Sequence, residues 1–177
     1  MLLDLRKEFG DILRDFGSDV VILHADRRFK CPACWDSATR EPRSDCDVCL
    51  GTGYMVRAFK ARARRVQMPV SSEAVPTYMG AALPPRKESP TPQLHDTEGF
   101  YLPHDVSISD GDYILAVRWA KGVPVRVERV YHVVRSDKIL GFRGRVEYIY
   151  ALGMFRAFDV PRFNGMLPRI KEALRNG

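Results

Sequence analysis

The chain has 177 residues, of which 45% are hydrophobic and 28% charged, a balance typical of a globular domain and unlike a disordered or collagen-like chain. No apolar run approaches the roughly 20 residues that span a bilayer, and residues 1–16 carry charges throughout, unlike a signal peptide. The net charge of +6 permits contact with nucleic acid and equally suits docking on an acidic protein. We therefore expect one domain with its own core and no membrane segment.

Residues 1–30 are predicted to form a helix and then a strand. Apolar side chains recur at helical spacing with charged residues between them; they are Leu2, Leu5, Phe9, Ile12, Leu13 and Phe16. Gly17 and Ser18 follow and are expected to end the helix. Residues 20–25, VVILHA, are rich in β-branched side chains and predict a strand that leads to the first cysteine.

Residues 31–53 hold two Cys-x-x-Cys pairs separated by 11 residues: Cys31, Cys34, Cys46 and Cys49. Zinc binds four thiolates at tetrahedral corners, and each pair can supply two of them. Gly51 and Gly53 let the backbone turn toward the sulfurs. The alternatives are two disulfides or four unrelated buried cysteines. We predict one Zn²⁺ ion, and because four cysteines leave no open coordination position, its role is expected to be structural.

Residues 54–68 are the most basic stretch and are predicted to form a strand, although the alanines also allow a helix. In a strand, Phe59, Ala61 and Ala63 share one face and three cations share the other. This stretch is expected to contact DNA or an acidic partner, unless it is only a solvated face. The candidate contact residues are Arg57, Lys60, Arg62, Arg64 and Arg65.

Residues 69–99 are rich in proline, serine and threonine without apolar periodicity, and predict a long loop or arm. Such a segment gains order most readily on a neighbouring subunit.

Residues 100–155 predict a β-meander of strands that each bury one face. Turns are expected at Gly111–Asp112, Gly122 and Ser136–Asp137. In the last strand, the predicted apolar face holds Phe142, Val146, Tyr148 and Tyr150, opposite Arg143, Arg145 and Glu147.

Residues 156–177 predict a tail with a short helix, in which Pro168 occupies the first turn. Its apolar stripe is Met166, Leu167, Ile170, Ala173 and Leu174. The expected fold is thus mainly β: a small β-barrel or sandwich with an N-terminal helix, a four-cysteine zinc-knuckle insertion, a long Pro-rich loop and a short C-terminal helix.

The sequence contains no Walker loop, dinucleotide glycine fingerprint, HExxH motif or nucleophile elbow. We therefore expect neither enzymatic activity nor a small-molecule substrate.

Residues 31–53, CPACWD…RSDCDVCLGTGY, resemble a zinc knuckle found in a group of tailed-bacteriophage virion proteins. The downstream run VSISDGDYILAV…VPVRVERVYHVVRSDKILGFRGRVEYIYALG resembles the β-barrel of phage head–tail connectors, called stoppers or head-completion proteins. Gly111 and Asp112 match the turn of that pattern, and residues 131–134 and 147–152 match its later strands. The small barrels of that family need no zinc, so the knuckle would be an added module.

This resemblance implies a structural protein of the virion neck, present in the host cytoplasm during assembly. Copies would form a homo-oligomeric ring between the portal or adaptor protein and the tail, and would help retain packaged DNA. The main alternative is a nucleic-acid-binding zinc-ribbon protein. A DnaJ-type chaperone is disfavoured, because residues 46–53 supply only one CxxCxGxG repeat and no HPD-bearing J domain is present.

Overall fold

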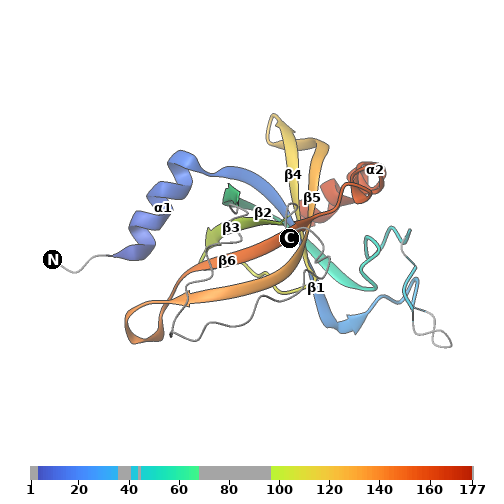
Figure 1. The fold of residues 1–177 in the computed structure, drawn as a ribbon. Coiled ribbons are helices and arrows are strands. Elements are labelled where there is room, and N and C mark those ends of the chain that lie inside the picture. The colour runs from blue at the N-terminus through green and yellow to red at the C-terminus, as the bar shows by residue number, and fades with distance from the viewer. Residues whose placement is uncertain (1–3, 36–40, 44, 68–96, 177) are drawn as a thin grey trace, which may run out of the picture.

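The computed structural model describes residues 4–35, 41–43, 45–67 and 97–176. A helix precedes six strands, and two short helices end the fold (Figure 1). The elements are α1 (Leu5–Phe16), β1 (Ser18–Lys30), β2 (Tyr54–Gln67), β3 (Thr97–Pro103), β4 (Tyr113–Ala120), β5 (Val123–Leu140), the 3₁₀ turn η2 (Phe142–Gly144), β6 (Val146–Phe155), α2 (Asp159–Gly165) and α3 (Leu167–Asn176). The predicted mainly-β fold class is confirmed.

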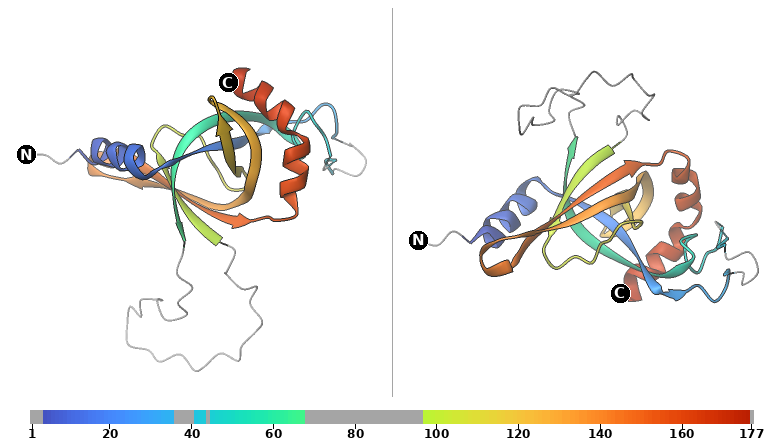
Figure 2. Two further views of the ribbon diagram at one scale, coloured as in Figure 1. Left: turned by 90° about the horizontal axis from the view of Figure 1, so that it is seen from above. Right: turned by 60° about the horizontal axis from the view of Figure 1, so that its bottom comes forward.

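The six strands close into an antiparallel barrel in the order β1-β2-β3-β6-β5-β4, visible in Figure 2. Strands β4, β5 and β6 pair in chain order, as expected of a meander. Strand β3 departs from this prediction, because its partners are β2 and β6. Closure satisfies the strand edges that an open sheet of this size would leave unpaired.

Inward-pointing side chains fill the barrel with one apolar core. At its centre, the rings of Phe100 and Tyr131 meet edge to face with centroids 4.9 Å apart. The connection between β3 and β4 adds Val106 and Ile108 to this core. Burial of each large apolar side chain contributes roughly 1.5–3 kcal/mol, so this core is a major source of the barrel's stability.

A second core lies outside the barrel wall, where α2 and α3 pack on β2 and β5 and enclose side chains of β1 and β4. Phe163 and Ile170 are fully buried there against Leu115 and Val127. The expectation that each strand buries only one face is therefore wrong for this part of the wall. The apolar stripe predicted for the C-terminal helix is the surface that makes this cover, with Met166 at the end of α2 and the rest on α3.

Helix α1 begins at Leu5 and packs on the outer surface of β2, β3 and β6. The ring of Phe9 stacks on Tyr148 with centroids 4.7 Å apart, and Arg6 Nε donates to the Val146 carbonyl at 2.7 Å. Within the described residues, no helix is both long and apolar enough to cross a bilayer.

Strand β6 buries the face that was predicted to be exposed. Glu147 is only 3% exposed and points inward with Ile149 and Ala151, whereas Tyr148 lies outside against α1. Two hydrogen bonds from Arg145, at 2.9 and 3.0 Å, neutralise the Glu147 carboxylate and make its burial tolerable.

Two expected boundaries are also corrected. Ser136–Asp137 is not a turn, because β5 continues to Leu140 and the chain reverses at residues 141–144, where Arg143 and Gly144 have positive φ. Ser136 instead donates its N–H to Asp110 Oδ1 at 2.8 Å. Of the predicted loop 69–99, residues 97–99 belong to β3; residues 69–96 lie outside the described part of the chain.

Candidate metal centre

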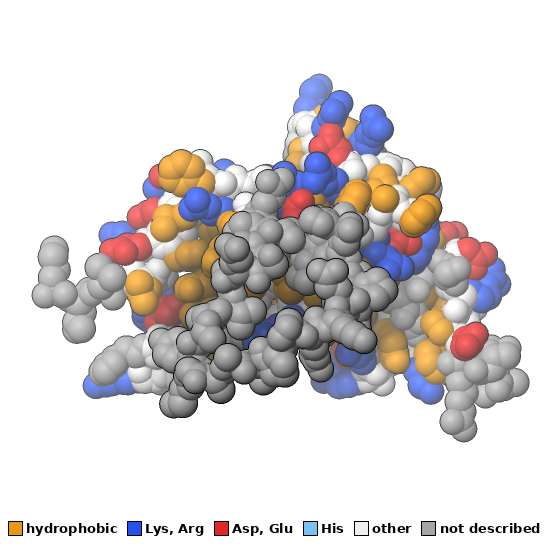
Figure 3. All heavy atoms as spheres, viewed as in Figure 1, with side chains coloured by type: hydrophobic (Ala, Val, Ile, Leu, Met, Phe, Trp, Pro, Cys, Tyr) orange, Lys and Arg blue, Asp and Glu red, His pale blue; other side chains and the backbone are white. Residues whose placement is uncertain are grey.

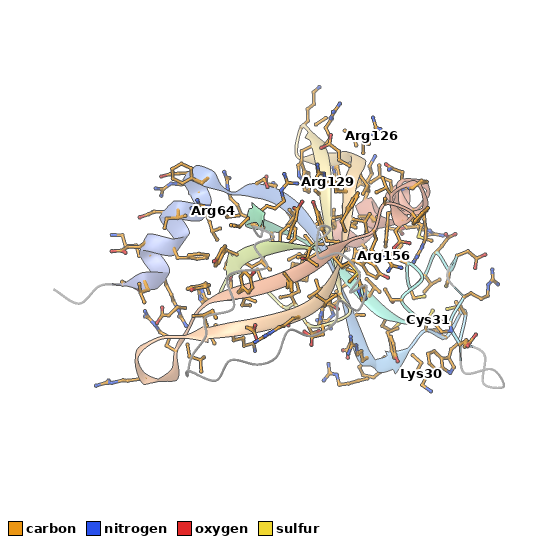
Figure 4. All side chains as sticks on the ribbon, viewed as in Figure 1. Lys30, Cys31, Arg64, Arg126, Arg129 and Arg156 are labelled. Atoms are coloured by element: carbon orange, nitrogen blue, oxygen red, sulfur yellow. The ribbon has the colours of Figure 1, made fainter. Side chains whose placement is uncertain are left out.

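The cysteine-bearing insertion forms a small lobe between the end of β1 and the start of β2 (Figure 4, where Lys30 and Cys31 are labelled). Lys30 pairs with Tyr54 across the base, and the Cys31 N–H donates to the Gly53 carbonyl at 2.9 Å. Strands β1 and β2 thus hold the two Cys-x-x-Cys turns opposite one another.

The four predicted ligands are brought together and are all buried. Their Sγ atoms lie within 4.8 Å of one another; Cys31 and Cys46 are 3.9 Å apart, and Cys34 and Cys49 are 3.4 Å apart. These separations far exceed the roughly 2.05 Å of a disulfide, and all four cysteines are free. Four sulfurs around one ion at a metal–sulfur distance of about 2.3 Å would lie about 3.8 Å apart. The cluster therefore has the donor set and spacing to hold one metal ion.

Backbone N–H groups converge on the sulfurs. Gly53 N–H donates to Cys49 Sγ at 3.3 Å. Burial acts to raise the pKa of Cys46, but hydrogen bonds from the Cys49 and Val48 N–H groups outweigh it and lower that pKa to about 7. Burial dominates at Cys34 and raises the pKa of that thiol to about 12. Cys46 is therefore more readily deprotonated than Cys34, and a bound cation would favour the thiolate form of both.

Positive-φ backbone shapes the second knuckle. Leu50, Gly51 and Gly53 have φ of 52°, 74° and 80°. A Cβ on Gly53 would lie 2.6 Å from the Pro42 side chain, so the position requires glycine for space as well as for conformation. Pro42 bridges to Trp35, whose ring lies 5.8 Å from that of Tyr54.

Two residues that the sequence analysis did not single out fix the lobe to the barrel. Leu50 is 3% exposed and belongs to the outer core beneath α2 and α3. Arg162 on α2 donates to the Leu50 carbonyl at 2.7 Å. An apolar residue directly after a cysteine was the one feature of the sequence that could have indicated the contact of Leu50 with the barrel. No local pattern around Arg162 indicates that it binds the lobe.

The basic residues of β2 divide between structural and exposed positions. As predicted, Ala61 and Ala63 face the interior while Lys60, Arg62 and Arg64 point outward. Lys60 forms an ion pair with Asp19 at 2.7 Å, and Arg62 donates to the Leu13 and Arg14 carbonyls. Arg64 lies over the ring of Phe16, 5.6 Å from its centroid.

Arg65 is exposed at one end of the barrel, where its Nε lies 3.2 Å from the Glu98 carboxylate. Tyr131 Oη and Arg129 contact the same carboxylate at 2.9 and 3.2 Å. Of the five predicted contact residues, Arg57 and Arg64 are exposed and form no hydrogen bond or ion pair with the described residues. The basic strand is therefore largely occupied with holding β2 to α1, β1 and β3.

A scan against models of known protein families gives no match to this chain, and no curated protein matches it.

Proposed function

We propose that this protein is a structural component of a tailed-phage neck, where copies form a ring that joins the portal complex to the tail and helps retain packaged DNA. The observation that carries this proposal is the architecture: a small closed barrel in which long stretches of sequence separate β1 from β2 and β2 from β3. The metal-binding lobe separates β1 from β2, and residues 68–96 separate β2 from β3. Together with the resemblance of residues 31–53 and 106–152 to virion proteins, this arrangement favours a module that binds neighbours over one that turns over a substrate.

In this proposal the partners are other copies of the chain, the portal or adaptor protein, the tail and the DNA in the channel. The protein would reside in the virion, after assembly in the host cytoplasm. Neither a membrane nor a small-molecule substrate is part of its role.

Quantitative mass spectrometry of purified particles, scaled to the major capsid protein, tests this function. We expect a small copy number, of the size of a ring. Absence from particles would overturn the proposal and would leave a nucleic-acid-binding zinc protein as the interpretation.

We also propose that the cluster of Cys31, Cys34, Cys46 and Cys49 holds one structural Zn²⁺. Four soft thiolates in a tetrahedral arrangement suit zinc or iron, and four protein ligands leave no open position for catalysis. The ion would hold the two knuckles together. Elemental analysis of the purified protein should give one zinc per chain and a colourless solution, whereas visible absorption with matching iron would contradict zinc.

A further inference from the structure

The hairpin of β4 and β5 extends beyond the barrel as a two-stranded ribbon. Strand β1 pairs with β4 only as far as Ala116, and β6 pairs with β5 only from Tyr131 onward. Residues 117–120 and 123–127 therefore form ladder pairs only with each other in the described structure, and Lys121–Gly122 forms the turn. Figure 3 shows Lys and Arg side chains gathered at this end of the molecule.

One face of the ribbon is a cationic surface. Val117 and Val127 face the outer core, so their neighbours Arg118 and Arg126 point away from it. These two arginines are direct cross-strand partners, an arrangement that like charges destabilise. Glu128 forms an ion pair with Arg118 at 3.0 Å, which offsets part of this repulsion. Arg126 and Lys121, by contrast, form no ion pair or hydrogen bond with the described residues.

The opposite flank of the tip is cationic as well. A groove of about 180 Å³ lies between the ribbon and α3, and Lys60, Lys171 and Arg175 line it beside Trp119. Asp19 pairs with Lys60. The two α3 cations, by contrast, have no ion-pair partner in the part of the chain that the structure describes.

We infer that this ribbon is a binding surface for duplex DNA, inserted into the major groove. The major groove admits a two-stranded β-ribbon, and an inserted ribbon has a phosphate row on either side. Cations on both flanks match that geometry, whereas an acidic protein surface would meet only one flank. At the tip, Val123 and Val125 are 39% and 43% exposed, and such apolar side chains can contact thymine methyl groups.

This inference goes beyond the proposed neck function and does not depend on it. Its test uses purified protein and DNA, whereas the neck function is tested by copy number in particles, so either can fail alone.

The probe is a fluorescein-labelled 24-base-pair duplex, and anisotropy is followed between 50 and 200 mM NaCl. The variant Arg118→Gln/Lys121→Asn/Arg126→Gln removes three charges from the ribbon; Asn tolerates the positive φ of 50° at position 121. We expect at least about tenfold weaker binding at 100 mM salt, and a log–log salt slope smaller in magnitude by about 2.7, at about 0.9 per lost phosphate contact. The matched control Lys7→Gln/Arg135→Gln/Lys138→Gln removes three exposed charges elsewhere and should change binding less than twofold.

Circular dichroism of both triple variants establishes that they are folded. Equal weakening by the two variants would overturn the inference, since binding would then follow net charge alone. Absence of binding at 50 mM salt would overturn it too. A labelled 30-residue polyglutamate that binds as tightly as the duplex, and loses affinity equally in the ribbon variant, would replace DNA with an acidic protein as the partner.

Discussion

The barrel and the cysteine lobe are two regions of one chain that are stabilised by different means. The barrel buries two apolar cores, one inside its wall and one beneath α2 and α3. Among the described residues of the lobe, the buried cluster comprises the four cysteines. Contacts that also order this part of the lobe include the Trp35–Pro42 bridge, the Trp35–Tyr54 contact and the attachment of Leu50 to the barrel.

This difference concerns what each region needs in order to fold. Apolar burial acts without a ligand, so the barrel is expected to be stable whether or not metal is present. The lobe has too few apolar side chains to offset the entropy of ordering its chain, and a metal ion is expected to supply the missing free energy. Metal loss should therefore unfold the lobe and spare the barrel.

The largest expected effect follows from Cys46→Ser. Loss of one thiolate should remove most of the metal-binding free energy, which is on the order of 10 kcal/mol for structural zinc. We expect bound zinc to fall below about one-fifth of the wild-type amount, and amides of residues 31–53 to lose hydrogen-exchange protection while the barrel strands keep theirs.

Val48→Ala is the matched control, because Val48 lies in the same knuckle, is 55% exposed and supplies no sulfur. It should retain zinc and protection. Full zinc content in the Cys46 variant would contradict the four-thiolate site. Loss of protection throughout the barrel would show that the contacts of Leu50 and Arg162 make the two regions one cooperative unit.

The second-largest expected effect is a loss of stability caused by a cavity in the barrel interior. Ile114 is fully buried there, and Ile114→Ala should lower the free energy of unfolding by about 2–5 kcal/mol. Urea unfolding followed by far-ultraviolet circular dichroism measures it. The exposed Val123→Ala should cost less than about 0.5 kcal/mol. A similar cost for both would indicate that Ile114 is not in a packed core.

The barrel and the lobe also differ in how much of their structure could be predicted from the sequence. The grouping of the four cysteines was predictable because Cys-x-x-Cys spacing is local, and β1 was predictable from its β-branched run, whereas the alanines of β2 also allowed a helix. The pairing of β3 with β6 was not, because it joins residues some fifty positions apart. The inward face of β6 was also missed, since α1 covers Tyr148 and Arg145 neutralises Glu147, and neither is a periodicity within the strand.

The buried polar cluster around Glu98 could not be predicted from the sequence either. Glu98 was placed in a loop, yet it lies in β3, accepts hydrogen bonds from Tyr131 and Arg129, and forms an ion pair with Arg65. Only the closure of the barrel brings these side chains together. Long-range hydrogen-bond partners of this kind cannot be deduced from local pattern.

The cluster around Glu98 gives the third prediction. Glu98→Gln keeps the volume but places an amide N–H₂ among groups that are already donors, so one donor loses its acceptor. We expect a loss of about 1–3 kcal/mol in the free energy of unfolding by urea. Glu128→Gln, which disturbs the exposed pair with Arg118, should cost less than about 1 kcal/mol. Equal costs would indicate that burial adds nothing to the Glu98 interactions.

The smallest expected effect is a pH dependence at His132, which lies half-buried on β5 beside Tyr113. Burial lowers the pKa of His132 below its usual 6.5, and Arg156 lowers it further. Because the unfolded chain then binds the proton more readily than the folded one, stability is complete above about pH 6.5 and falls as the pH drops from there toward the folded pKa. Wild-type protein should therefore lose more stability between pH 7 and pH 5 than His132→Gln does, in urea titrations at each pH. His104→Gln removes an exposed histidine and should leave the wild-type slope unchanged. If the His132 variant keeps the wild-type slope, that side chain does not cause the acid sensitivity of the barrel.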